Sequence, residues 1–196
     1  MTRSLNKWIE RLAVAMAILG GIVLTALVLL ICLSIVGRTL NGAFHGPIGA
    51  VLPGLSEWAI AAGVGPINGD FELVEAGVAF AIFAFLPICQ LHGSHATVDI
   101  FTRFLPGRLN RLLEAAIAGI FAAVLVLIAI QLEAGMQSKL RSGQTTFLLQ
   151  FPVWWGYAAS LLGASVAALI ASYIAIVRWI DLFRGHDGLA EFEDRS

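Results

Sequence analysis

Four long stretches without a charged side chain alternate with polar segments along this chain. The uncharged stretches cover residues 12–36, 76–91, 115–132 and 144–177. About 20 apolar residues in a helix cross the ~30 Å hydrocarbon core of a bilayer, so each stretch is of the right order to span it. We predict an all-α polytopic membrane protein with one membrane domain over residues 1–196. Its four transmembrane helices are expected at about 12–36, 72–91, 114–133 and 152–178.

Composition supports this fold class, because 59% of the residues are hydrophobic and 13% are charged, against about a quarter charged in soluble domains. The net charge of −1 gives no sign of nucleic-acid binding, and the expected surroundings are a lipid bilayer. Cys32 and Cys89 lie inside apolar runs, which predicts buried thiols rather than a disulfide. The first run is longer than the core of a signal peptide, so we expect it to remain as a helix.

Residues 39–71 carry seven glycines and three prolines, and a continuous spanning helix is not expected there. Leu55–Val64 is predicted to be a short helix capped by Ser56, with Trp58 at the membrane interface. A re-entrant dip is the less favoured alternative. In the second span, Pro87 predicts a kink or an early end of the helix.

The positive-inside rule predicts the orientation. Nine of the twelve lysines and arginines lie in the N-terminal tail, the 92–113 connection and the C-terminal segment. The other three are Arg38, Lys139 and Arg141. Both termini and the 92–113 connection are therefore expected in the cytoplasm, and the Gly/Pro-rich loop 39–71 faces outward.

Small residues recur every four positions in the first and fourth spans, as on helices that pack closely in lipid. The stripe in the first span is Ala13, Ala17, Gly21 and Thr25. The stripe in the fourth is Gly156, Ser160, Ala164, Ala168 and Ser172. We predict that these stripes are packing faces, the alternative being that Ala and Gly are simply common in membrane helices. Interfacial aromatic belts are predicted at Trp154, Trp155 and Tyr157 and at Trp179.

Ionisable residues gather at the ends of the spans rather than in their middle. We predict an ion pair between Arg38 and Glu75 that fixes helix packing, in preference to a proton or substrate relay. Glu72 and Glu75 lack the Glu-x-x-His partners of di-iron bundles.

His92, His95 and Asp99 have a spacing that would suit a metal site on one helix face. Capping and hydrogen bonding in a polar interfacial loop are the preferred interpretation, because no fourth ligand is near in sequence. We therefore predict no catalytic, cofactor or metal site. Because broken helices and midplane polar groups are also missing from the pattern, the chain is not expected to carry substrate by itself.

Several short motifs occur together in a fixed order. They are Arg38-Thr-Leu-Asn, Glu75 opening the second span, Gly93-Ser-His95-Ala-Thr-Val-Asp99, Ser142-Gly-Gln-Thr-Thr and Phe151-Pro152-Val-Trp154-Trp-Gly-Tyr157. Over roughly residues 10–180 the chain resembles the small membrane subunit of tripartite ATP-independent periplasmic (TRAP) transporters, the DctQ-like family. Its loop 39–71 is longer than the short first loop of that family.

The resemblance implies a scaffold beside a large TRAP membrane subunit that holds the substrate and coupling-ion sites. A periplasmic substrate-binding protein would deliver an organic acid or related solute, and an ion gradient, commonly sodium, would drive symport across the bacterial inner membrane. It implies structural or partner-contact roles for Arg38, Glu75, His95, Asp99, Pro152 and Trp154. Glu72, Gly156, Ser160 and Ala164 join them as candidates from their positions in the sequence.

The prediction is thus a four-helix membrane bundle acting as a non-catalytic small permease subunit. One alternative is a membrane anchor for a redox or enzyme complex, which copurifying haem or a dehydrogenase would favour. A self-assembling channel or stand-alone carrier is the other.

Overall fold

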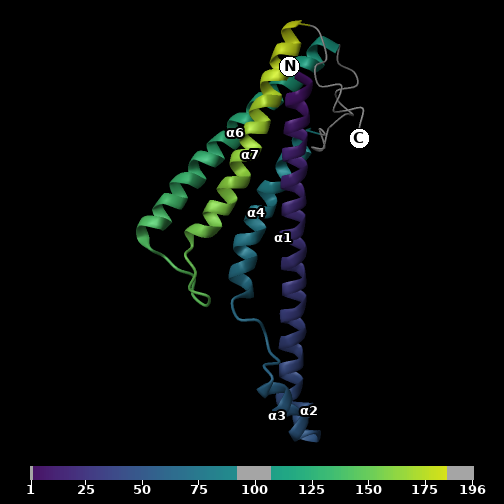
Figure 1. Ribbon diagram of the computed structural model, residues 1–196, viewed down its shortest axis with the longest axis vertical. Helices are drawn as coiled ribbons and strands as arrows, with labels where there is room; N and C mark the ends of the chain where they lie inside the picture. The colour runs from purple at the N-terminus through teal and green to yellow at the C-terminus, as the bar shows by residue number, and fades with distance from the viewer. Residues whose placement is uncertain (1, 92–106, 185–196) are drawn as a thin grey trace.

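The computed structural model describes residues 2–91 and 107–184, and within these ranges all the regular elements are helices (Figure 1). The helices are α1 (Thr2–His45), α2 (Pro47–Val51), α3 (Pro53–Ala61), α4 (Asp70–Leu91), α6 (Gly107–Ser142) and α7 (Trp154–Arg184). Four of them, α1, α4, α6 and α7, are long and apolar enough to cross a membrane. The prediction of an all-α protein with four spans is confirmed.

The four spans form an open row in the order α6, α7, α4, α1 rather than a closed bundle (Figure 1). Helix α4 packs against α1 and α7, and α7 packs against α4 and α6. The row narrows where the start of α1 meets the C-terminal part of α7, and it widens toward the opposite end (Figure 1). We call these the near end and the far end.

Helices α1 and α4 run antiparallel and meet through residues spaced seven apart on both helices. The paired positions, with α1 first, are Ala13–Leu91, Gly20–Ala84, Leu27–Gly77 and Ser34–Asp70. The approach is close, because a Cβ added at Gly20 would lie 2.9 Å from the Ala84 Cβ. A seven-residue repeat keeps one seam facing its partner in left-handed helix packing.

The four-residue stripe predicted on α1 does not follow this seam. Thr25 is exposed, and a Cβ added at Gly21 would meet nothing within 4 Å. A step of four residues turns the helix by about 40° beyond a full circle, so such a stripe leaves the contact face after one or two steps. Its first member, Ala13, lies in the α1–α4 seam.

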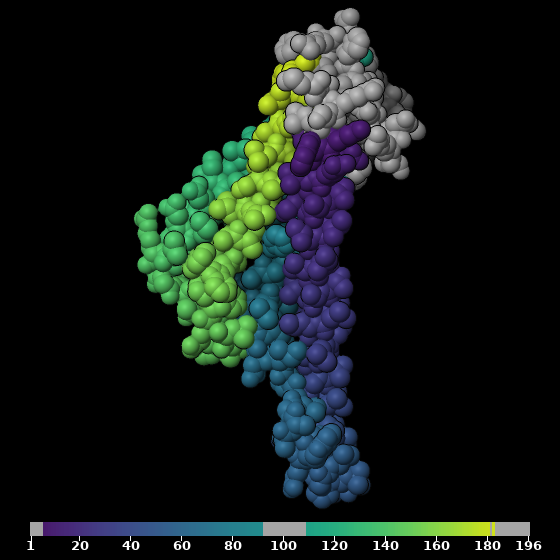
Figure 2. All heavy atoms as spheres, in the orientation of Figure 1, coloured from purple at the N-terminus to yellow at the C-terminus, as the bar shows by residue number. Residues whose placement is uncertain are grey.

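Helix α1 continues well past the end of its apolar run. Its 44 residues extend about 66 Å at 1.5 Å per residue, and the far part carries α2 and α3 as a projecting knob (Figure 2). Gly37 allows the returning chain to lie against α1, because a Cβ there would be 2.1 Å from the Gly65 carbonyl oxygen.

The short helix predicted at Leu55–Val64 exists as α3, but its cap differs from the prediction. Leu52 precedes the first helical residue, Pro53, whose missing N–H suits that position. Ser56 is not the cap, and its hydroxyl donates instead to the carbonyl of Phe44 on α1, at 2.6 Å. The hydroxyl therefore joins the knob to α1.

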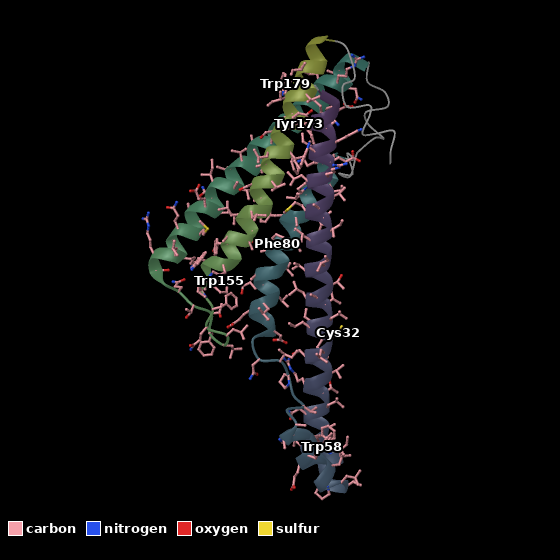
Figure 3. All side chains as sticks on the ribbon, in the orientation of Figure 1. Cys32, Trp58, Phe80, Trp155, Tyr173 and Trp179 are labelled. Atoms are coloured by element: carbon pink, nitrogen blue, oxygen red, sulfur yellow. The ribbon has the colours of Figure 1, made fainter. Side chains whose placement is uncertain are left out.

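Two further expectations from the sequence are corrected. Of the kink or early end predicted at Pro87, the early end is wrong, because α4 continues to Leu91 with the proline buried inside it. Cys32 is not buried, and its side chain points away from the other helices (Figure 3), whereas Cys89 is partly buried. In a membrane protein an apolar run marks contact with lipid as readily as contact with a core.

Candidate functional site

The polar contacts at the far end centre on two carboxylates in the first turn of α4. Asp70 accepts a hydrogen bond from the Ser34 hydroxyl, 2.5 Å from its Oδ2, and one from the Phe71 N–H at 2.7 Å. The same Ser34 oxygen accepts the Ile67 N–H at 3.2 Å. Ser34 is fully buried and Asp70 is partly buried, so the hydroxyl joins α1 to the start of α4 at a partly buried contact.

The predicted ion pair between Arg38 and Glu75 is not present, and both side chains are exposed. The register of α1 on α4 explains this. Arg38 lies a turn beyond Ser34, and Glu75 lies more than a turn on the other side of Asp70. Their Cα atoms are therefore about 13 Å apart along the helix axes. The carboxylate nearer to Arg38 is that of Asp70.

Glu72, the second carboxylate, binds the backbone of the α6–α7 loop (residues 143–153). Its Oε1 accepts the Leu148 N–H at 2.6 Å, and its Oε2 accepts the Leu149 N–H at 2.9 Å. Gly69 lets the chain approach closely, since a Cβ there would be 2.4 Å from the Leu149 Cγ. One side chain thus fastens the start of α4 to a loop 76 residues further along the chain.

The loop itself is closed by backbone hydrogen bonds. Thr145 and Pro152 form an isolated antiparallel bridge. The Thr146 N–H donates to the Phe151 carbonyl at 2.9 Å, and the Val153 N–H donates to the Gln144 carbonyl at 3.0 Å. Pro152 therefore lies in the bridge, two residues before α7 begins at Trp154. The motifs Ser142-Gly-Gln-Thr-Thr and Phe151-Pro152-Val-Trp154 form the two arms of one tight loop.

Two turn positions in this loop have left-handed backbone conformations. Gly143 has φ of +62°, which glycine adopts without steric cost. Gln150 has φ of +53°, which is uncommon for a side chain of its size. The compact hydrogen-bonded loop holds this less favourable conformation in place.

Helix α7 carries its small residues toward both neighbours. Gly156 faces α4, where a Cβ would lie 3.2 Å from the Ala76 Cβ. Ser160 and Ala164 are buried, with 2% and 0% of their surface exposed. Ala168 lies in the apolar cluster shared with α6. The four-residue stripe predicted on α7 winds from the α4 side to the α6 side, and its contacts are made because α7 has a helix on each flank.

A hydrogen bond and an ion pair contribute to holding the near end together. The Tyr173 hydroxyl of α7 donates to Asn6 of α1, and the guanidinium of Arg178 lies 2.9 Å from a Glu114 carboxylate oxygen. Arg178 and Glu114 connect α7 to α6, and the labelled Tyr173 and Trp179 lie in this part of the molecule (Figure 3). Polar contacts therefore hold the helices together at both ends of the row.

The sequence prediction missed Ser34 and Asp70 and included residues that the structure does not describe. His92, His95 and Asp99 lie outside the described ranges. Ser34 could have been found as a polar residue seven positions after Leu27 in an apolar run. Its partner, Asp70, could not, because that depends on where α4 begins. Within residues 2–91 and 107–184, no group of three His, Cys, Asp or Glu side chains is placed to hold a metal ion.

Replacing Glu72 with Gln is expected to loosen the α6–α7 loop. The amide keeps one acceptor oxygen, so one of the two N–H groups of Leu148 and Leu149 loses its partner, and the charge-assisted bond is weakened. Hydrogen–deuterium exchange at these two amides should become faster by roughly tenfold, as expected for losing about 1.4 kcal/mol of protection. The matched control is Glu75→Gln on the same helix. Glu75 is exposed, so unchanged exchange in both variants would contradict the role given to Glu72.

Comparison with known proteins identifies the family to which the chain belongs. The model of the DctQ component of tripartite ATP-independent periplasmic transporters matches residues 27–185, most of the chain. No curated protein and no solved structure matches. The matched region includes the Ser34–Asp70 contact, the Glu72-bound loop and the whole of α7. With four apolar helices long enough to span a bilayer and this match, the chain belongs to the DctQ family of TRAP transporter small permease subunits.

Proposed function

We propose that this subunit is a non-catalytic scaffold, which holds the large TRAP membrane subunit while that partner carries the solute. The observation that supports this most is the open row of helices. In their most apolar stretches, α1, α4 and α6 bury 17% of their residues within the chain, whereas α7 buries 50%. Three spans therefore leave most of their surface for lipid or for another membrane protein.

Part of the uncovered surface of α1 consists of small residues. Gly21 and Thr25 lie outside the α1–α4 seam. Between helices in lipid the hydrophobic effect gives no net attraction, so close backbone approach at small residues supplies much of the association energy. An uncovered small-residue stripe on α1 fits a partner helix better than it fits the chain's own interior.

The distribution of polar contacts favours a supporting role over a transport role. In the described ranges, the polar contacts between spans lie at the near end or the far end, as at Tyr173 and Glu72. A solute pathway is expected to place polar groups near the midplane, often on broken helices. The solute and coupling-ion sites are therefore assigned to the large subunit, with delivery by a periplasmic substrate-binding protein. Organic acids or related solutes are the proposed cargo, as the family suggests.

The location proposed is the bacterial inner membrane, with both termini in the cytoplasm. The near end, with Lys7 and Arg11, carries more of the basic residues than the far end. Reporter fusions after residue 196 and within the knob test this orientation. A cytoplasm-dependent reporter should be active at the C-terminus and inactive in the knob, and the reverse pattern would reject it.

Copurification tests the scaffold role. The chain is expressed from its native operon, extracted in a mild detergent and identified with its partners by mass spectrometry. A larger polytopic membrane protein in stoichiometric amount is the expected result. Recovery of the chain alone as a defined oligomer that transports solute in vesicles would reject the scaffold role, and a haem-bearing or dehydrogenase partner would support an anchor instead.

A further inference from the structure

The tip of the α6–α7 loop presents three apolar side chains to the outside. Phe147, Leu148 and Leu149 have 91%, 57% and 41% of their surface exposed. These three residues lie within the uncharged stretch 144–177 but before the start of α7, and the structure places them at the tip of a loop. Side chains of this size in contact with water would each forfeit roughly 1.5–3 kcal/mol of burial free energy.

Several backbone N–H groups of the tip are hydrogen-bonded within the protein. The N–H groups of Leu148 and Leu149 donate to Glu72, and the Thr146 N–H donates to the Phe151 carbonyl. In a bilayer, a backbone donor without a partner costs several kcal/mol, which normally excludes irregular loops. Because these three donors are bonded within the protein, they add nothing to the cost of moving the tip out of water.

The surroundings of the tip are those of a membrane interface. Phe151 and Trp155 stack with ring centroids 6.3 Å apart, and Trp154 meets Trp155 edge-on at 6.2 Å. Trp155 lies at the far end of α7, next to the loop (Figure 3). Aromatic side chains of this kind gather at the headgroup level. No charged residue occurs from Gln144 to Val177, so the apolar surface of the tip is continuous in sequence with the bilayer-spanning surface of α7.

We propose that the α6–α7 loop is a membrane anchor, with Phe147 and Leu148 inserted into the interfacial region of the bilayer at the far end. The occupant of this surface is the lipid itself, because the tip adjoins the exposed apolar part of α7 and offers apolar side chains while the N–H groups of Leu148 and Leu149 are bonded to Glu72. Glu72 binds the loop to the start of α4 through hydrogen bonds, while the apolar side chains of the tip bind it to the lipid. The loop thereby fixes the depth of α6 and α7 in the membrane, and this does not depend on the scaffold role.

Site-directed spin labelling measures the depth directly. In a Cys32→Ser, Cys89→Ser background, Phe147→Cys carries a nitroxide, and the full chain is placed in phosphatidylethanolamine–phosphatidylglycerol vesicles. Oxygen concentrates in lipid and a nickel chelate stays in water, so their ratio of accessibilities reports insertion. The ratio at position 147 should exceed, several-fold, the ratio at Arg141→Cys, an exposed position just before the loop. The ratio at Leu148→Cys should agree with the ratio at Phe147→Cys, which would show that the result is not a local effect of one label.

Two results would overturn the anchor. A ratio at positions 147 and 148 equal to that at Arg141→Cys would place the tip in water. Low accessibility to both oxygen and the chelate would place the tip against protein, in a self-associated chain. A raised oxygen ratio at both tip positions supports the proposal, and adding the copurified partner should leave that ratio unchanged.

Discussion

The substitution Gly20→Leu is expected to force α1 and α4 apart and to destabilise the protein. Gly20 lies where a Cβ alone would come within 2.9 Å of the Ala84 Cβ and 3.5 Å of the Ala81 carbonyl, and the side chain of leucine is far larger. Overpacking of this kind typically costs 1–3 kcal/mol or more. For a chain of this size that corresponds to a loss of roughly 2–12 °C in melting temperature. Thermal unfolding of the purified chain in detergent measures it.

The neighbouring residue gives a matched control. Gly21 is in the same helix and the same surroundings, but a Cβ there would meet nothing within 4 Å. Gly21→Leu is expected to leave the melting temperature of the isolated chain within about 1–2 °C of the original, as for most substitutions on an open surface. Equal losses from Gly20→Leu and Gly21→Leu would mean that the seven-residue seam is not the contact between these helices.

Ala164→Leu is the second substitution with a large expected effect. Ala164 has no exposed surface and lies on the helix that packs against both α4 and α6. Adjacent Gly163 is already tight, since a Cβ there would lie 2.9 Å from the Phe83 Cβ. The chain has little room to adjust, so we expect a loss of about 2–3 kcal/mol and weaker copurification of the large subunit.

The control for this substitution is Ala26→Leu, an exposed alanine on α1. The substitution adds the same three carbon atoms at a position that faces no other helix of the chain, so the melting temperature should not change. A normal melting temperature for Ala164→Leu, together with normal recovery of the partner, would contradict the packing role of α7.

The spans could be predicted from the sequence because charge is absent over a length that matches a bilayer. The face that each helix turns toward its neighbour could not be predicted, because a helix that is apolar on every side gives no signal for that face. Ala13, Gly20, Leu27 and Ser34 repeat every seven residues, but Ala13, Ala17 and Gly21 repeat every four just as visibly. Only the position of α4 decides between them.

The polar contacts show the same dependence on register. Glu72 was a candidate for a structural or partner-contact role, and in the structure its carboxylate accepts hydrogen bonds from the backbone N–H groups of Leu148 and Leu149, which no side-chain pattern reveals. Arg38 and Glu75 were matched by their nearness to the ends of two spans. That reasoning assumed that both helices end at the membrane surface, whereas α1 continues to His45. The end of an apolar run marks where the lipid ends, and it does not mark the end of the helix.

The unequal lengths of the apolar runs have a consequence for the lipid around the subunit. Residues 12–36 of α1 extend about 38 Å along the helix axis, whereas residues 115–132 of α6 extend about 27 Å. These helices form the two edges of the row, and α6 is inclined to α1 (Figure 1). The subunit therefore has no single hydrophobic thickness. A bilayer that met both edges without any tilt of α1 would have to thicken at α1 and thin at α6, and each ångström of that mismatch would cost a fraction of a kcal/mol.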